Sequence, residues 1–262
     1  MSTIQDGMFF SVKLKIERAK DHIRDLSNKL IDYLKLKPFK VVVELDNKSH
    51  NHLWTLRVKH DVPCLFAAII GDVIHNLRAS LDLLATELVS HTGENANNVY
   101  FPFGNDEASL DDMIKKRHID RAGEEIVTLV KSFKPYKGGN ILLRALHDLD
   151  ITDKHKSLIP VAHYAGIKNF QMFNASGPML TIQNMHCGPI RDGMVLMSLP
   201  PAHNVTVGQS FQPSLKLTLN EEVLQTDDDL IQLLNRFVSL VEDMVSQFEA
   251  HFEDHSNKEN SK

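Results

Sequence analysis

The chain is poor in cysteine, and its two cysteines lie far apart. Cys64 and Cys187 form no Cys-x-x-Cys pair, so the sequence favours neither a thiolate zinc site nor a disulfide scaffold. Long apolar runs are missing as well, and the longest, Val62 to Ile70, is too short to span a bilayer. The N-terminus has no basic segment followed by an apolar one, as a secretory signal would. We therefore expect a cytoplasmic protein that does not enter the membrane.

Signatures of common nucleotide and hydrolase sites are also missing. The chain has no Gly-x-Gly-x-x-Gly, no P-loop and no Gly-x-Ser-x-Gly elbow, and we expect no cofactor. A formal net charge of −5 gives no overall attraction for nucleic acids or acidic membranes. The 29 Lys and Arg residues still leave room for a local basic patch.

What is present is the composition of an ordinary globular protein. The 262 residues are 42% hydrophobic and 24% charged, which is enough material for a sizeable core. No linker divides the chain convincingly. We expect a single α+β domain over residues 1–254 and a disordered polar tail over 255–262.

Apolar periodicity predicts three long amphipathic helices, at 9–34, 61–91 and 226–252. Shorter helices are expected at 109–117, 121–131 and 140–150, and a β-hairpin at 40–45 and 52–58. Further short strands are expected at 169–173, 179–183, 193–198 and 214–219. The predicted fold class is therefore α+β, a bundle of three long helices plus shorter ones, packed with one antiparallel β-sheet.

A polar stripe interrupts the second long helix. At 100° per residue, Gly71, His75, Arg78 and Asp82 fall within about one sixth of the circumference, and the apolar stripe lies roughly 120° away. A glycine inside a helix costs about 1 kcal/mol relative to alanine. We therefore expect a backbone or a ligand to approach closely at Gly71.

The stripe has two interpretations. His75 can exchange a proton near neutral pH, Arg78 can hold a phosphate or carboxylate, and Asp82 can orient a neighbouring base. Alternatively, Arg78 and Asp82, spaced i and i+4, pair with each other, and the stripe is internal scaffolding between helices.

A second polar cluster lies downstream, between Arg144 and Lys156. If this segment packs against the second long helix, both clusters converge and form an electrostatic site for a nucleotide or RNA phosphate. The residues expected to be catalytic are His75 or His155, which would handle the proton, and Asp82, which would orient a base. Those expected to bind the ligand are Asn76, Arg78, Arg144, His147, Asp153 and Lys154.

Metal binding is the other chemistry that these residue types permit. His75, His147 and neighbouring Asp residues offer nitrogen and oxygen ligands. The chain has no His-Glu-x-x-His or Glu-x-x-His pairing, however. We therefore expect no metal at the site.

The segment from about Gly71 to Lys156 resembles a family of bacterial and phage-borne proteins that has no established activity. The resemblance is carried by His75-Asn-Leu-Arg78 with Leu81-Asp82, and by Leu146-His147 with Asp153-Lys154-His155-Lys156. It implies a bacterial protein but assigns no reaction.

At the level of fold, the segment is also loosely similar to HEPN-type helical domains, which include many RNases. Their RNase signature is an Arg and a His on one helix, separated by about four to six residues. In this chain the next histidine after Arg78 is His91, which is too far away, and Arg144 and His147 are too close together. The signature is therefore not matched.

A non-catalytic role competes with the phosphate site. In that alternative the protein is an interaction module, and its polar stripe serves only to hold helices together. The long first and last helices are then expected to pair with a second copy of the chain, which gives a homodimer.

Overall fold

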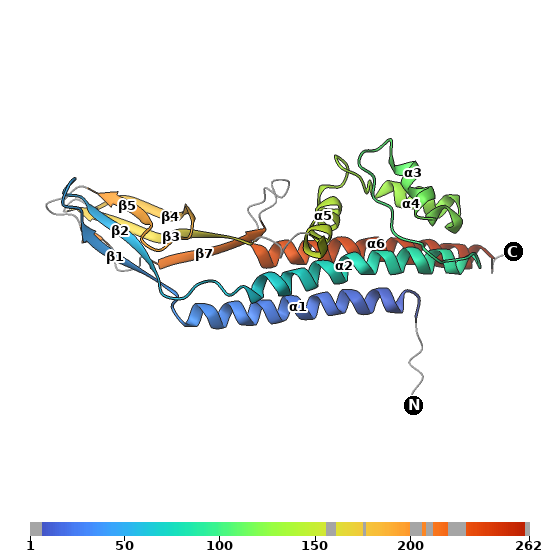
Figure 1. Cartoon of the computed structure of the whole chain (residues 1–262), viewed down its shortest axis with the longest axis horizontal. Helices are drawn as coiled ribbons and strands as arrows, with labels where there is room; N and C mark the ends of the chain where they lie inside the picture. Colours follow the sequence, from blue (N-terminus) through green and yellow to red (C-terminus); the bar gives the residue numbers. More distant parts are fainter. Residues whose placement is uncertain are drawn as a thin grey trace, which may run out of the picture. The chain divides into compact units, whose positions relative to one another are not determined.

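The fold was determined as a computed structural model, which describes residues 7–155, 161–174, 177–199, 206–207, 212–219 and 229–259. Its chain divides into two compact units. Unit 1 comprises Met1–Leu26, Leu65–Ile159 and Glu221–Lys262, and unit 2 comprises Ser27–Cys64 and Pro160–Asn220. The first is helical and the second consists mainly of strands (Figure 1). The α+β class is therefore confirmed, while the folding of both units as a single domain stays a prediction.

Unit 1 is built around three long helices. They are α1 (Phe10–Lys35, whose last turns belong to unit 2), α2 (Leu65–His91) and α6 (Leu230–Glu259). The shorter elements are α3 (Leu110–Lys116), a 3-10 turn (Ile119–Ala122), α4 (Glu124–Ser132) and α5 (Ile141–His155). The α-helices coincide with those that the sequence predicts to within a few residues at their ends, except that α5 and α6 continue further toward the C-terminus. The 3-10 turn was not predicted as a separate element, because the sequence indicates one helix over 121–131.

The core of unit 1 lies where α2 meets its neighbours. α2 supplies a run of fully buried apolar side chains, and α6 and α1 each present an apolar stripe. Ion pairs join α1 to α6, including Lys13 to Glu249 at 2.5 Å and Lys20 to Glu242 at 2.6 Å. Burial of apolar surface supplies most of the stability of such a bundle, and exposed ion pairs add little.

α6 begins at a well-formed cap. The backbone N–H of Gln232 donates to the Asp229 carboxylate at 2.9 Å, and the Gln232 side chain accepts from the Asp229 backbone N–H at 3.1 Å. This reciprocal capping box satisfies two backbone donors and fixes the first turn. The sequence places the cap at Thr226, which lies outside the described residues. At its other end α6 runs to Glu259, into the segment expected to be a tail.

The described strands of unit 2 form two antiparallel sheets, where the sequence predicts one. One sheet has the order β1 (Phe39–Leu45), β2 (His52–Val58) and β5 (Val195–Leu199). The other consists of β4 (Gly177–Pro189), β3 (Val161–Asn174), β6 (Thr206–Val207) and β7 (Gln212–Leu219), with β7 also paired to β3. The predicted hairpin is present, with Val41 opposite Leu56. Pairing between strands distant in sequence is what local patterns leave undetermined.

Candidate functional site

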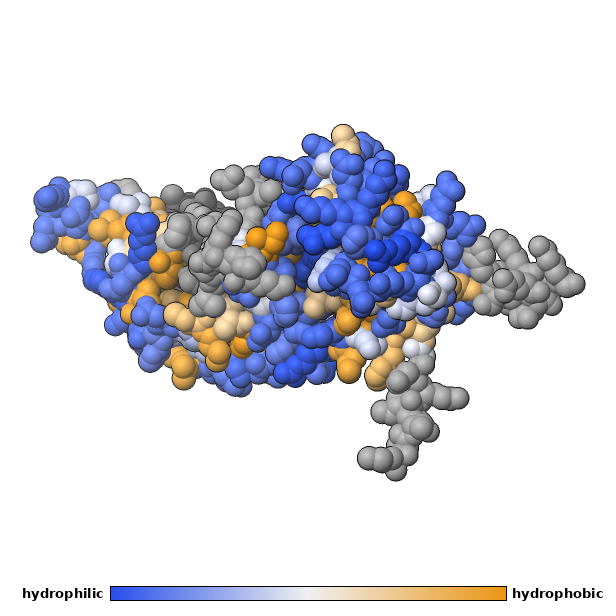
Figure 2. Space-filling view, turned by 45° about the vertical axis from the view of Figure 1, so that its right-hand side comes forward, coloured by the Kyte–Doolittle hydropathy of each residue, from blue (hydrophilic) through white to orange (hydrophobic). Residues whose placement is uncertain are grey.

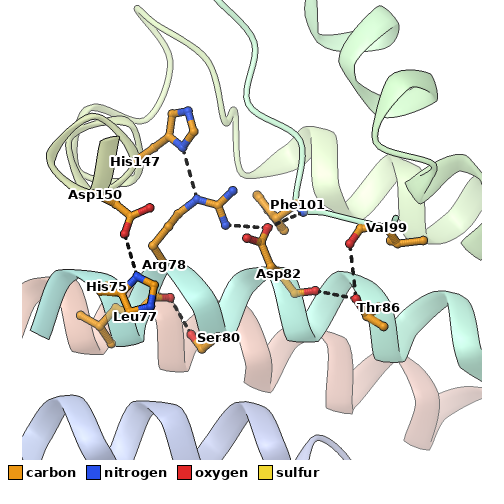
Figure 3. A network of polar contacts seen from close by, with 10 residues as sticks. All are labelled: His75, Leu77, Arg78, Ser80, Asp82, Thr86, Val99, Phe101, His147 and Asp150. Atoms are coloured by element: carbon orange, nitrogen blue, oxygen red, sulfur yellow. Dashed lines mark hydrogen bonds and ion pairs between the residues drawn. The ribbon is translucent and has the colours of Figure 1, made fainter. Parts of the chain in front are cut away.

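The two polar clusters do meet, because α5 packs against α2 within unit 1. Figure 3 shows His147 and Asp150 on α5 pointing toward Arg78 and His75 on α2. The spacing of these residues places each pair on one face of its helix. The convergence that the sequence predicts is therefore present for part of the set.

Arg78 is at the centre of the network and is almost completely buried, with 7% of its surface exposed. Its Nε donates a hydrogen bond to Nδ1 of His147 at 3.2 Å. Its Nη1 lies 2.7 Å from Oδ1 of Asp82, which gives an ion pair by distance. No N–H bond of Nη1 points at an acceptor with hydrogen-bond geometry among the described residues. The attraction to Asp82 is thus mainly Coulombic.

Asp82 also holds the loop that follows α2. Its Oδ1 accepts the backbone N–H of Phe101 at 2.9 Å. One turn later, the Thr86 hydroxyl donates to the Asp82 carbonyl at 3.0 Å and lies 3.4 Å from the Val99 carbonyl (Figure 3). These contacts anchor the loop on α2. The Asp82 carboxylate thus has two structural partners, Arg78 and the backbone of Phe101.

Phe103, in the same loop, contacts both Arg78 and His147. The Arg78 guanidinium carbon lies 4.7 Å from the centre of the Phe103 ring, a cation–π distance. The His147 ring stacks on the same phenyl ring, with 4.1 Å between centroids and 4° between planes. Because arginine can only donate, His147 accepts at Nδ1 and carries its proton on Nε2.

His75 and Asp150 form a separate pair at the edge of the network. Nδ1 of His75 lies 3.1 Å from Oδ1 of Asp150. The Asp150 side chain is 6% exposed, whereas that of His75 is 45% exposed. An ionised carboxylate accepts from the Nδ1–H tautomer and leaves Nε2 as the acceptor. In its geometry the pair resembles the carboxylate–histidine arrangement that orients a general base.

A close approach is present at Gly71, but the group that approaches is a side chain of α5, where the sequence predicts a backbone or a ligand. A Cβ atom at Gly71 would lie 2.6 Å from Oδ1 and 2.8 Å from Oδ2 of Asp153. Real side-chain carbons do not come so close to a carboxylate. The glycine therefore leaves room for the Asp153 carboxylate beside α2.

We expect Gly71→Ala to stabilise the wild type by clearly less than the gain of about 1 kcal/mol that helix propensity offers, because the Asp153 carboxylate has to move aside. In an Asp153→Ala background no carboxylate is displaced, and the same substitution should gain the full amount. Denaturant unfolding of all four proteins measures the difference between the two backgrounds. An equal gain in both would contradict the close approach.

Other residues predicted for the site have different partners. Arg144 makes a bidentate pair with Asp148, at 2.9 and 2.8 Å, and donates to the Gly104 carbonyl at 2.8 Å. Asn76 lies on another face of α2, where its Oδ1 accepts from Lys15 of α1 at 3.3 Å. Arg144 thus holds a loop, and Asn76 bridges two helices.

The side chains of two residues predicted for the site are not described. Lys154 and His155 belong to the last turn of α5, but their side chains lie outside what the structure describes. Asp153 contacts Gly71, as described above. Of the three residues expected to share a site, His75 and Arg78 lie on one face of α2, and the place of the His155 side chain stays a prediction.

Sequence reasoning missed several members of the network. Phe101 and Phe103 are 1% and 6% exposed, and no local pattern in the sequence indicates that their loop contacts the polar stripe. Asp150 was expected only as part of a charged segment, although it is the partner of His75. The signal for Asp150 is its place one helical turn from His147, on the face that meets α2.

Within the described residues, no group of three or more His, Cys, Asp or Glu side chains is arranged to hold a metal ion. No described helix is long and apolar enough to cross a membrane. Comparison of the chain with protein-family models, with curated proteins and with solved structures finds no match.

Proposed function

We propose that the protein is a non-catalytic interaction module of the bacterial cytoplasm. In this proposal the polar stripe of α2 is an internal brace, by which we mean that Arg78 and Asp82 hold α5 and the loop of Phe101 against α2. The observation that carries this proposal is the burial of Arg78, which is 7% exposed and has its charged group engaged by Asp82, His147 and Phe103. The resemblance of the Gly71–Lys156 segment to the bacterial and phage-borne family is part of the same proposal.

Energetics favour the brace over an anion site at Arg78. To bind a phosphate, the guanidinium would have to leave Asp82 and the Phe103 ring and return to water. Removing one member of a buried ion pair is costly, because the other member is left as an uncompensated charge. Arg144 is engaged in the same way, by Asp148 and the Gly104 carbonyl. The arginines that the sequence offers for anion binding are thus used within the fold.

A second candidate function rests on His75 and Asp150. The buried carboxylate orients a half-exposed imidazole whose Nε2 is directed away from it. Such a pair can take a proton from water or a hydroxyl group that attacks a phosphate ester. The ligand would be a nucleotide or RNA held at the exposed edge of His75, without help from Arg78.

Thermal unfolding with and without ligand discriminates the two functions. The probes are AMP, ATP, a short single-stranded RNA and pyrophosphate, each with and without Mg²⁺. The interaction module predicts no change in Tm with any of them. A ligand at 100 times its Kd would instead stabilise by about 2.7 kcal/mol, or several degrees for a protein of this size.

The variant His75→Gln tests whether a ligand-induced rise in Tm comes from the site at His75. His22→Gln on α1 is the matched control. A rise in Tm that His75→Gln abolishes and His22→Gln retains would contradict the non-catalytic module and support the phosphate site. A rise that both variants retain would contradict the non-catalytic module as well, and would place the ligand away from His75.

A further inference from the structure

α1 carries a second stripe, on the side opposite its buried one. The buried side chains Val12, Ile16, Ala19, Ile23 and Leu26 face the core. At 100° per residue, the opposite face holds residues at alternating steps of four and three. They are Phe10, Leu14, Glu17, Asp21, Arg24, Asn28, Ile31 and Lys35. All are exposed except Asp21, which is partly exposed. We call these eight residues the outer seam.

The outer seam has the spacing of a coiled-coil interface. Its apolar members lie toward its ends: Phe10 and Leu14 are 37% and 59% exposed, and Ile31 is 49% exposed. Its middle is charged. Figure 2, in which α1 runs along the lower edge, shows apolar surface toward both ends of that edge and hydrophilic surface between them. Single exposed apolar residues are ordinary, but a heptad spacing of them is a feature of helices that pair.

The order of residues along the outer seam is complementary to its own reverse. When two copies run antiparallel about an axis midway between Asp21 and Arg24, each Asp21 faces the other copy's Arg24. The same register sets Leu14 against Ile31, and Glu17 against Asn28. Phe10 then meets the aliphatic stem of Lys35. A two-fold interface requires this kind of self-complementarity.

We propose that the protein forms a homodimer through antiparallel pairing of its two α1 helices along the outer seam, with Asp21 of each copy paired to Arg24 of the other. A parallel pairing would set Glu17, Asp21 and Arg24 each against its own copy, so that like charges meet at three successive seam positions. Charge thus selects the antiparallel register, and the apolar ends supply the buried area. The inference rests on the proposed interaction module and names its partner.

In the single chain, Arg24 already pairs with Asp21 on its own helix. Dimerisation therefore exchanges one ion pair for another, and the charges contribute specificity more than affinity. We expect a dimer that dissociates on dilution. Salt should weaken it only modestly, since the apolar ends are insensitive to screening.

Sedimentation velocity of the full chain and of two charge variants tests the register. Asp21→Arg sets Arg against Arg, and Arg24→Asp sets Asp against Asp, so each variant alone should dimerise at least about tenfold more weakly than the wild type. An equimolar mixture should form a heterodimer with two restored pairs. The flanking variant Arg18→Asp makes the same charge change off the seam and should dimerise as the wild type does.

A wild type that stays monomeric at about 100 µM, a protein concentration at which weak interfaces form, would overturn the proposal, as would single variants that dimerise normally.

Disulfide trapping tests the direction. In a Cys64→Ser/Cys187→Ser background, Leu14→Cys/Ile31→Cys should yield a covalent dimer, because the register places these positions opposite each other. Leu14→Cys alone should not, since the two Leu14 positions lie about 25 Å apart in the antiparallel pair and a disulfide needs Cα atoms within about 7 Å. Efficient trapping through Leu14→Cys alone would overturn the antiparallel register. Ligand-induced stabilisation, in contrast, would contradict the proposed interaction module without changing the results of the sedimentation and trapping experiments.

Discussion

Arg78→Met lowers the free energy of unfolding by about 2–4 kcal/mol. Removing one partner of a buried ion pair costs about 3–5 kcal/mol, because the other charge stays uncompensated. The lower end applies here, since the Asp82 side chain keeps 30% exposure and accepts the Phe101 N–H. Methionine retains most of the side-chain volume, so that the loss reports on charge. Denaturant unfolding followed by circular dichroism measures it.

Two further variants separate the charge effect from a general loss of packing. Arg18→Met, at an exposed position on α1, should change stability by less than about 0.5 kcal/mol. Arg78→Met/Asp82→Asn removes both charges and keeps an acceptor for Phe101, so it should be more stable than Arg78→Met alone. Wild-type stability in Arg78→Met would mean that Arg78 does not brace the fold.

Phe103→Ala has a comparable expected effect, a loss of about 3–5 kcal/mol. The ring is 6% exposed and supports both the stacked His147 and the Arg78 guanidinium. Its removal leaves a cavity and withdraws the cation–π contact. Tyr100→Ala in the same loop is the matched control, because Tyr100 is 42% exposed, and its loss should stay below about 1 kcal/mol.

A double-mutant cycle shows whether Phe103 and Arg78 act together. Combining Phe103→Ala with Arg78→Met should cost less than the sum of the single effects, by at least about 0.5 kcal/mol, because the second substitution removes contacts that the first has already lost. Additive losses would mean that the ring and the guanidinium stabilise the fold independently.

The sequence predicted the helices and the hairpin well, because their signals are local. Apolar periodicity placed α1 and α2 within a few residues, and the β-branched run before Leu45 placed β1. Whether strands form one sheet or two depends on partners that lie far away in the chain. β5 joins β2 with Met197 opposite Trp54, a pairing between residues more than a hundred positions apart. Local propensity carries no information about such a contact.

For the candidate site, the sequence predicted the location better than the role of each residue. Helical spacing correctly brought His75 and Arg78 to one face, and the glycine signal indicated a close approach at Gly71 without identifying Asp153 as the group that makes it. The same spacing could not tell whether Arg78 faces solvent or a phenyl ring. That depends on how the loop carrying Phe103 returns over α2. Burial decides between a ligand site and a brace, and burial is a tertiary property.

Amide hydrogen exchange of the wild type and Arg78→Met tests the brace most directly. In Arg78→Met we expect faster exchange than in the wild type at the Phe101 amide, which donates to Asp82, and along α5. Exchange in β1 and β2 of unit 2 should stay unchanged, because local openings raise exchange only where contacts are lost. Unchanged protection at Phe101 and α5, together with wild-type stability, would contradict the conclusion that Arg78 holds these segments to α2.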